Sequence, residues 1–211
     1  MRMARNIASI GAVGSLSLLA ACGDPVPPAA QAGLSIHLQQ YDPMDPVHGM
    51  DRCPPYRHWV SVPFQTERTY MNQIQTTDGS SSSAKAVNNQ EGNTVGCSVK
   101  PSGSVFVVSG DAKAFAQYKE EKYSPSIVHI RIPQVGSGDS AAKGTLTIQD
   151  HASLEPYTST ECAYSVQGGA LGVDPGKIWG SVKCENLSLD KSPGSACLVD
   201  VGYFVFENCA Q

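Results

Sequence analysis

The chain has 211 residues, of which 41% are hydrophobic and 16% charged, and its formal net charge at pH 7 is −4. This length suits one domain, or two small ones sharing a sheet, and it is sufficient to bury an apolar core. The excess of acidic residues argues against nucleic acid as a partner, which needs a basic surface, and against electrostatic docking on anionic lipid.

The N-terminal residues have the composition of an export signal. Arg2 and Arg5 carry positive charge, and an uncharged stretch dominated by Ile, Ala, Leu and Gly follows over residues 7–20. That stretch is shorter than the roughly 20 apolar residues of a transmembrane helix and has the length of a signal-peptide core. We therefore expect residues 1–21 to be removed, which leaves 190 residues with a formal charge of −6.

The signal segment ends in Leu19-Ala20-Ala21-Cys22, which resembles the lipobox of bacterial lipoproteins. The resemblance implies that the Cys22 sulfur receives a diacylglyceryl group and that a dedicated signal peptidase cuts after Ala21. Two or three acyl chains hold a protein stably on a membrane, since each buried methylene contributes about 0.8 kcal/mol and a single chain holds only marginally. We therefore expect the lipid bilayer as a partner and a location in the cell envelope, at the outer membrane in preference to the inner one.

A proline-rich stretch follows the cysteine. Pro25, Pro27 and Pro28 fall within four positions, and such composition favours an extended, semi-rigid spacer. We expect the lipidated cysteine and its tether to occupy residues 22–33 and a single β-rich domain to occupy residues 34–211.

Residues 41–51 contain the sequence's best candidate for a metal site. Met44, His48 and Met50 combine thioethers with an imidazole, a ligand set that favours copper(I). Aspartates of the same segment offer the oxygen ligands that suit calcium instead: Asp42, Asp45 and Asp51. The alternative is a proline-rich exposed connection without metal, and beyond the covalent lipid we expect no cofactor.

The remaining sequence predicts a mainly β fold. Eight segments alternate between apolar and polar residues or are rich in β-branched and aromatic residues: 34–39, 60–64, 104–109, 127–132, 144–148, 162–166, 177–184 and 199–206. Glycine, proline, serine and aspartate separate them, which is typical of an antiparallel β-sandwich or a jelly-roll-like body.

Three further features of this region can be interpreted locally. In 127–132 the alternation directs His129 away from the core, and Trp179 is expected inside it. Only 111–122 has near-helical spacing, although it also suits a connection between strands. The polar segment 75–96 is expected to form a mobile surface loop.

Six cysteines remain once Cys22 is assigned to lipid, and an even set in an exported chain predicts three disulfides: Cys53, Cys97, Cys162, Cys184, Cys197 and Cys209. Zinc and iron–sulfur sites bring cysteines two to four residues apart, whereas the closest pair here is twelve apart. Sequence alone does not select one of the possible connectivities. Local reasoning favours Cys53–Cys97, with the other four pairing among themselves, and a hairpin places Cys162 near Cys184.

The C-terminal part of the chain, with Ile178-Trp179-Gly180-Ser181-Val182-Lys183-Cys184, Cys197 and the segment 203–209, resembles uncharacterised β-rich lipoproteins of myxobacterial type. The resemblance implies a shared fold and a surface location. It carries no activity and no active-site residues.

No catalytic motif is present: the sequence has no Gly-x-Ser-x-Gly turn, no histidine pair at the spacing of zinc hydrolases and no phosphate-binding glycine loop. We therefore expect a non-enzymatic, membrane-anchored module that binds an envelope protein or polysaccharide or has a structural role. One alternative is a metal-binding lipoprotein that uses Met44, His48 and Met50. A second is an envelope hydrolase with dispersed carboxylates or an Asp150–His151 pair.

Overall fold

A computed structural model describes eight stretches of the chain: residues 27–40, 58–62, 85–118, 121–136, 141–149, 155–165, 172–189 and 192–211. The secondary structure of these stretches consists of antiparallel strands, and disulfides join them. The predicted fold class is therefore confirmed. Within the described stretches, no helix has the length and apolar character needed to cross a membrane.

The strands follow the chain in this order: β1 (Gln31–Gln40), β2 (His58–Val62), β3 (Ala86–Val87), β4 (Thr94–Ser102), β5 (Val105–Tyr118), β6 (Glu121–Gly136), β7 (Ala141–Gln149), β8 (Tyr157–Ser165), β9 (Gly172–Asp174), β10 (Lys177–Leu189) and β11 (Ser192–Glu207). They form one sheet in the order β2-β1-β11-β10-β8-β7-β6-β5-β4, with β3 beside β1 and β9 beside β10. The first strand, β1, thus pairs with the last, β11.

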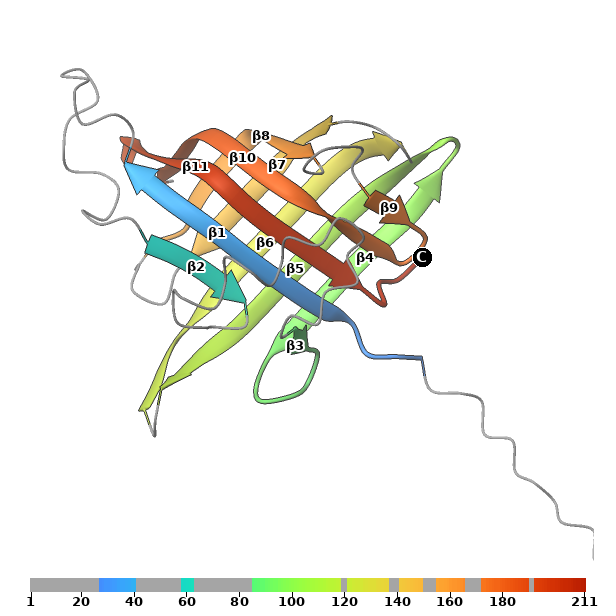
Figure 1. Cartoon of the computed structure of the whole chain (residues 1–211), viewed down its shortest axis with the longest axis horizontal. Helices are drawn as coiled ribbons and strands as arrows, with labels where there is room; N and C mark the ends of the chain where they lie inside the picture. Colours follow the sequence, from blue (N-terminus) through green and yellow to red (C-terminus); the bar gives the residue numbers. More distant parts are fainter. Residues whose placement is uncertain are drawn as a thin grey trace, which may run out of the picture.

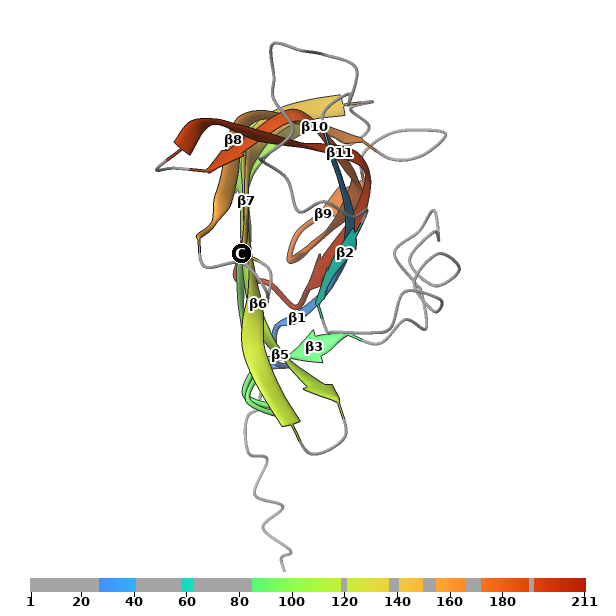
Figure 2. The same ribbon diagram turned by 90° about the vertical axis from the view of Figure 1, so that its left-hand side faces the viewer.

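The sheet folds over on itself and forms two layers (Figures 1 and 2). One layer contains β4 to β7, the other contains β1, β2 and β11, and the strands of the two layers cross in Figure 1. Phe206 of β11 reaches the opposite layer, since a Cβ built on Gly110 of β5 would lie 2.6 Å from Cζ of its ring. The apolar core lies between the layers, as in a β-sandwich.

Alternation along the strands assigns each side chain to the core or to the outer face. Leu34, Ile36 and Leu38 of β1 are buried in the core. In β6, Val128 and Ile130 are also buried, whereas the intervening His129 is 46% exposed. The predicted outward direction of His129 is therefore confirmed, because a strand repeats every two residues.

The bend between the layers lies at β8 and β10. These strands pair in two separate stretches, residues 163–165 with 181–183 and residues 157–158 with 188–189. The Cys162–Cys184 disulfide lies at the break between them, with a Cα–Cα distance of 4.4 Å, close to that of a non-hydrogen-bonded antiparallel pair. The covalent bond holds the strands together where the ladder is interrupted, and it confirms the predicted proximity of these two cysteines.

The helical interpretation of residues 111–122 is wrong. β5 continues as a strand to Tyr118, with Ala112 and Ala114 buried and Lys113 between them exposed. Its neighbour β6 pairs with it along most of its length. Pairing between distant residues decides the conformation here, because the local spacing suits either structure and β propensity depends strongly on context.

Two segments expected to lie outside the sheet contribute to it. The strand expected from Leu34 begins at Gln31, which pairs with Glu207. Within the predicted loop 75–96, the prediction is wrong for residues 86–87 and 94–96, which belong to β3 and β4, whereas residues 88–93 between them form a turn with residues 89–92 exposed. β3 has only two residues, and it forms a strand because it pairs with β1.

The second disulfide, Cys97–Cys209, joins β4 to the C-terminus across 112 residues. The predicted Cys53–Cys97 pair is therefore wrong, as is pairing of the last four cysteines only among themselves. Because the sheet folds over on itself, the residues after β11 reach the edge strand β4, which a local argument does not detect. Cys197 is also disulfide-bonded, and its partner lies outside the described residues.

The two disulfides are expected to contribute unequally to stability. In the chain-entropy account, a 112-residue loop is worth about 5 kcal/mol and a 22-residue loop about 3 kcal/mol. Replacing Cys97 and Cys209 together by alanine should therefore lower the free energy of unfolding more than replacing Cys162 and Cys184. Urea denaturation followed by circular dichroism measures both. A larger loss for the Cys162–Cys184 variant would show that its position at the bend outweighs loop length.

Candidate functional site

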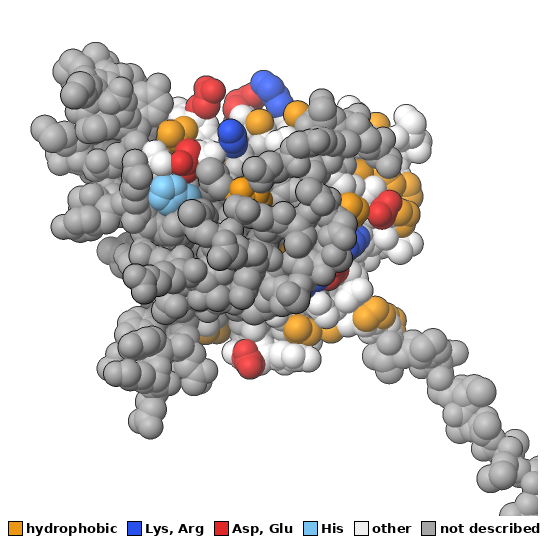
Figure 3. Space-filling view, in the orientation of Figure 1, with side chains coloured by type: hydrophobic (Ala, Val, Ile, Leu, Met, Phe, Trp, Pro, Cys, Tyr) orange, Lys and Arg blue, Asp and Glu red, His pale blue; other side chains and the backbone are white. Residues whose placement is uncertain are grey.

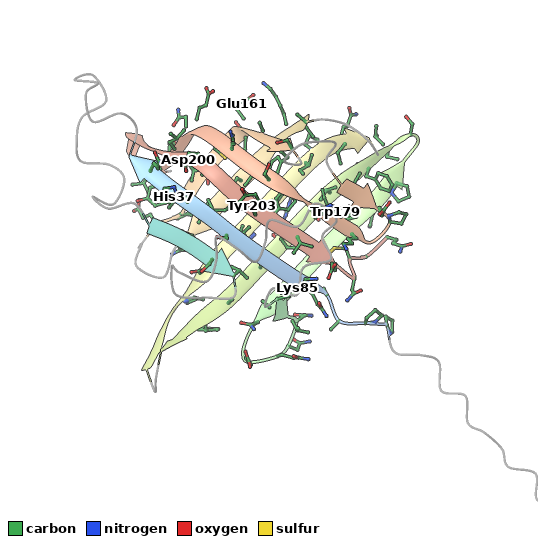
Figure 4. All side chains as sticks on the ribbon, viewed as in Figure 1. His37, Lys85, Glu161, Trp179, Asp200 and Tyr203 are labelled. Carbon is green, nitrogen blue, oxygen red and sulfur yellow. A yellow bond between two sulfur atoms is a disulfide. The ribbon has the colours of Figure 1, made fainter. Side chains whose placement is uncertain are left out.

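His37 of β1 and Asp200 of β11 meet where the two strands run side by side (Figure 4), and Gln39 of β1 contacts the same aspartate. Nδ1 of His37 lies 2.8 Å from Oδ1 of Asp200, and the side-chain amide of Gln39 donates to Oδ2 of the same carboxylate. The side chain of His37 is 12% exposed and that of Asp200 is 32% exposed. The carboxylate thus fixes the orientation of a largely buried imidazole.

The register of β1 and β11 explains how these residues meet. His37 pairs with Val201 and the next residue, Leu38, pairs with Val199, so that Asp200 is skipped by the ladder. Such a bulge re-aims the side chain of the extra residue. Because Leu38 points into the core, His37 lies on the opposite face of β1, where the carboxylate of Asp200 reaches it.

The same face of β1 continues with buried serines. Ser35 lies in register with Tyr203 of β11 on one side and with Ser61 of β2 on the other, and both serines are almost inaccessible to solvent. Among the described residues, the Ser35 hydroxyl is the buried side-chain group that lacks a hydrogen bond. β1 is therefore buried on both faces, as a central strand of a layered protein is.

An aspartate that orients a histidine is the arrangement used in general-base catalysis. The contacts of His37 and Gln39 with Asp200 also join β1 to β11. The same geometry therefore suits a link between these two strands.

A second polar cluster lies at the other end of the β1–β11 pair. Nζ of Lys177 lies 2.8 Å from Oε1 of Glu207, and Lys85 is bonded to Oε2. The Lys177 ammonium also lies 4.9 Å from the centroid of the Trp179 ring, a favourable cation–π distance. Trp179 is only partly buried, which differs from its predicted place in the core.

The environment of Glu207 alters its ionisation. Burial opposes the charged form, but hydrogen bonds and charge from Lys177 and Lys85 outweigh burial and lower the pKa of Glu207 below its ordinary value of 4.5. A carboxylate between two ammonium groups is the expected form at neutral pH. The cluster connects the start of β10, the residue before β3 and the end of β11.

A third group, on β5 and β6, is exposed. Oδ1 of Asp111 lies 2.5 Å from Nδ1 of His129 and 3.0 Å from Nη2 of Arg131. All three side chains are at least 40% exposed. Exposed ion pairs of this kind contribute little to stability, because water and salt screen them. Their exposure makes them accessible to a partner.

Charges of both signs are interspersed on the described surface. In Figure 3, acidic and basic side chains lie close together and the visible hydrophobic side chains form small separate spots. The exposed Lys143–Glu161 pair, 2.9 Å apart, is one example.

The structure does not describe several of the residues singled out from the sequence. Cys22, the copper candidates Met44, His48 and Met50, and the Asp150–His151 pair lie outside the described residues. Within the part of the chain that the structure describes, no three His, Cys, Asp or Glu side chains are grouped as metal ligands.

The His37–Asp200 pair was not predicted from the sequence. The two residues are 163 positions apart, and no motif connects them. The alternation of 34–39 predicts only that His37 faces away from the core, so the pairing of β1 with β11 was needed to find its partner.

The Glu207 cluster should make stability depend on pH in the acidic range. Because the pKa of Glu207 is lowered in the folded protein, its contribution is present above the unfolded value and is lost as pH falls through the folded value. The variant Glu207→Gln should therefore lose less stability than the wild type as pH falls below about 4.5. Urea midpoints measured from pH 7 to pH 3 test this, with Glu161→Gln of the exposed pair as a control that follows the wild type.

The His37–Asp200 contact should show measurable coupling. In a double-mutant cycle with alanine at both positions, we expect about 1 kcal/mol of coupling free energy, because the pair is partly buried and hydrogen-bonded. The same cycle on the exposed Asp111–His129 pair should give below about 0.5 kcal/mol. Equal values for both cycles would contradict a role for His37 in joining β1 and β11.

No family model matches the chain, and neither a curated protein nor a solved structure matches it. Its function is therefore argued from the chain's own residues.

Proposed function

We propose that the protein is a cell-envelope lipoprotein, anchored through lipid on Cys22, whose β body is a non-enzymatic binding or structural module. The outer membrane is the proposed location, and an envelope protein or polysaccharide is the proposed partner. The proposal combines the lipobox at residues 19–22 with the disulfide chemistry and geometry of the body.

The observation that carries the proposal is the state of the cysteines. Each of the five cysteines that the structure describes is disulfide-bonded: Cys97, Cys162, Cys184, Cys197 and Cys209. Four of these pair with one another, so Cys197 requires one of the other two, Cys22 and Cys53. If Cys53 is that partner, one cysteine remains without a bridge, and it is the one within the lipobox. Stable disulfides also suit an exported protein, because reducing cellular compartments keep thiols free.

The N-terminal side of β1 is attached to the body close to the C-terminus. The Asn208 side chain donates a hydrogen bond to the carbonyl oxygen of Ala29, 3.0 Å away, and the backbone N–H of Asn88 donates to that of Ala30 at 2.9 Å. The proposed tether, residues 22–33, therefore overlaps the body from Ala29 onward, and the chain before Ala29 would leave the body at this end. The exposed group of Asp111, His129 and Arg131 lies in the opposite layer and is available to a partner.

A binding or structural role is favoured because the buried polar groups connect strands. His37 with Asp200 and Lys177 with Glu207 each join neighbouring strands. The alternatives, metal binding by Met44, His48 and Met50 or hydrolysis by dispersed carboxylates or an Asp150–His151 pair, rest mainly on residues outside the described part of the chain. They are treated as outcomes of the experiment below.

The intact mass of the full chain, extracted in detergent and recorded without reductant, tests the proposal. We expect loss of residues 1–21, added acyl mass on Cys22 and the loss of six hydrogens for three disulfides. Peptide mapping should find Cys53 joined to Cys197. The variant Cys22→Ala should lose the acyl mass and leave the membrane fraction, whereas a Cys162→Ala, Cys184→Ala control should retain both.

Two results would contradict the proposal. An unmodified Cys22 thiol would remove the anchor, and a Cys22–Cys197 disulfide would leave Cys53 as the free cysteine. Additional native mass equal to one metal ion, lost in a Met44→Leu, Met50→Leu variant, would favour the metal-binding alternative over the plain β module.

A further inference from the structure

The outward edge of β4 is the end of the sheet, and three different features block part of its backbone from pairing with another strand. β4 pairs with β5 on one side only within the sheet order. Exposed edges of this kind are templates for pairing with another chain, and natural proteins block them. The groups that point away from β5 belong to the odd-numbered residues of β4, as the contacts of Cys97 and Val99 establish.

Two of the three features are local. The N–H of Val95 donates to Oδ1 of Asn88 at 3.0 Å, so a side chain takes the place of a neighbouring strand. At the other end of β4, Pro101 has no N–H to offer, and proline is typical of edge positions for that reason. These two positions leave the centre of the strand, at Cys97 and Val99, to be occupied.

The C-terminal residues occupy the centre of the edge. The N–H of Val99 donates to the carbonyl oxygen of Ala210, and the N–H of Ala210 donates to that of Cys97, both at 2.9 Å. Ala210 thus makes a parallel bridge with Ser98. The Cys97–Cys209 disulfide and a hydrogen bond from Cys209 N to Gly176 O, at 2.9 Å, hold this short segment in place.

We propose that residues Cys209–Gln211 form an edge cap that prevents β4 from pairing with β4 of a second copy of the chain. The second copy is the occupant favoured by symmetry, because an edge strand is self-complementary about a two-fold axis and needs no other surface to match. Ala210 occupies the Val99 N–H and the Cys97 carbonyl oxygen, two of the groups that an added strand would use. This inference depends on the fold and is independent of whether Cys22 carries lipid.

Deletion of Ala210 and Gln211 from the full chain tests the cap. It removes both hydrogen bonds to β4 and leaves Cys209 and its disulfide in place. Deletion of Gln211 alone is the matched control, since it retains both bonds. Native mass spectrometry of the detergent-extracted chains should show dimer for the two-residue deletion, with a dissociation constant lower than the control's by about tenfold or more.

Two measurements locate the new contact. Adding Ser98→Lys to the two-residue deletion places like charges across the proposed β4–β4 pair, together with the existing Lys100, and should restore the monomer. Hydrogen exchange should show the Val99 amide exposed in the monomer of the deletion variant and protected in its dimer. Near-ultraviolet circular dichroism verifies that the deletion variant is folded, and if it is not, Ala210→Pro in the complete chain removes the donor to Cys97 instead.

Each outcome of these experiments either supports the edge cap or overturns it. A folded deletion variant that remains monomeric at every concentration at which the control is monomeric would overturn the proposal. So would a dimer that persists with Ser98→Lys or that leaves the Val99 amide exposed, because its contact would lie elsewhere. Loss of lipid on Cys22 with an unchanged response to the deletion would refute the proposed function and leave the edge cap standing.

Discussion

The constraint on which the rest of the structure depends is the attachment of the C-terminus to the edge strand β4. A single sheet that folds over on itself must be held at the edges as well as at the bend, because the two layers could otherwise separate at their edges. The bend is held by Cys162–Cys184, within a hairpin-sized loop, whereas the edge is held by Cys97–Cys209 across 112 residues. A bond that closes so long a loop removes more freedom from the unfolded chain than a short one. It also brings Ala210 within hydrogen-bonding distance of β4. The same disulfide therefore holds the two layers together and places Ala210 on the β4 edge.

The two layers fit together because small residues face large ones. Gly110 of β5 is the clearest example, since a Cβ there would lie 2.6 Å from the Phe206 ring. Phe204, two residues earlier in β11, meets Tyr164 edge to face at 5.5 Å, a geometry that aromatic pairs prefer. Burial raises the pKa of Tyr164, so the phenol stays protonated and donates to the carbonyl oxygen of Thr145 at 2.7 Å. The Tyr164 hydroxyl can therefore lie in the core because it has a hydrogen-bond partner.

The sequence predicted what depends on neighbouring residues and missed what depends on distant ones. Alternation in 127–132 gave both the strand and the outward direction of His129, because a period of two is a local property. Residues 111–122 were ambiguous for the same reason, since their spacing suits a helix until β6 is known to pair with them. The partners Cys97–Cys209 and His37–Asp200 are separated by 112 and 163 residues. The pairing of β1 with β11 brings His37 to Asp200, and the folding of the sheet brings the residues after β11 to β4.

The position of the proposed anchor has a mechanical consequence for the body. Tension on the chain before Ala29 would enter β1 directly, and β1 pairs with β11 from Gln31 to Gln40 while β2 and β3 flank its other edge. Force along a strand loads the hydrogen bonds of its ladders together, whereas force across a hairpin opens them one at a time. The polar contacts of His37 and Glu207 lie toward opposite ends of the β1–β11 ladder and add resistance there. A body attached in this way would bear load through β1, a strand that is paired on both edges.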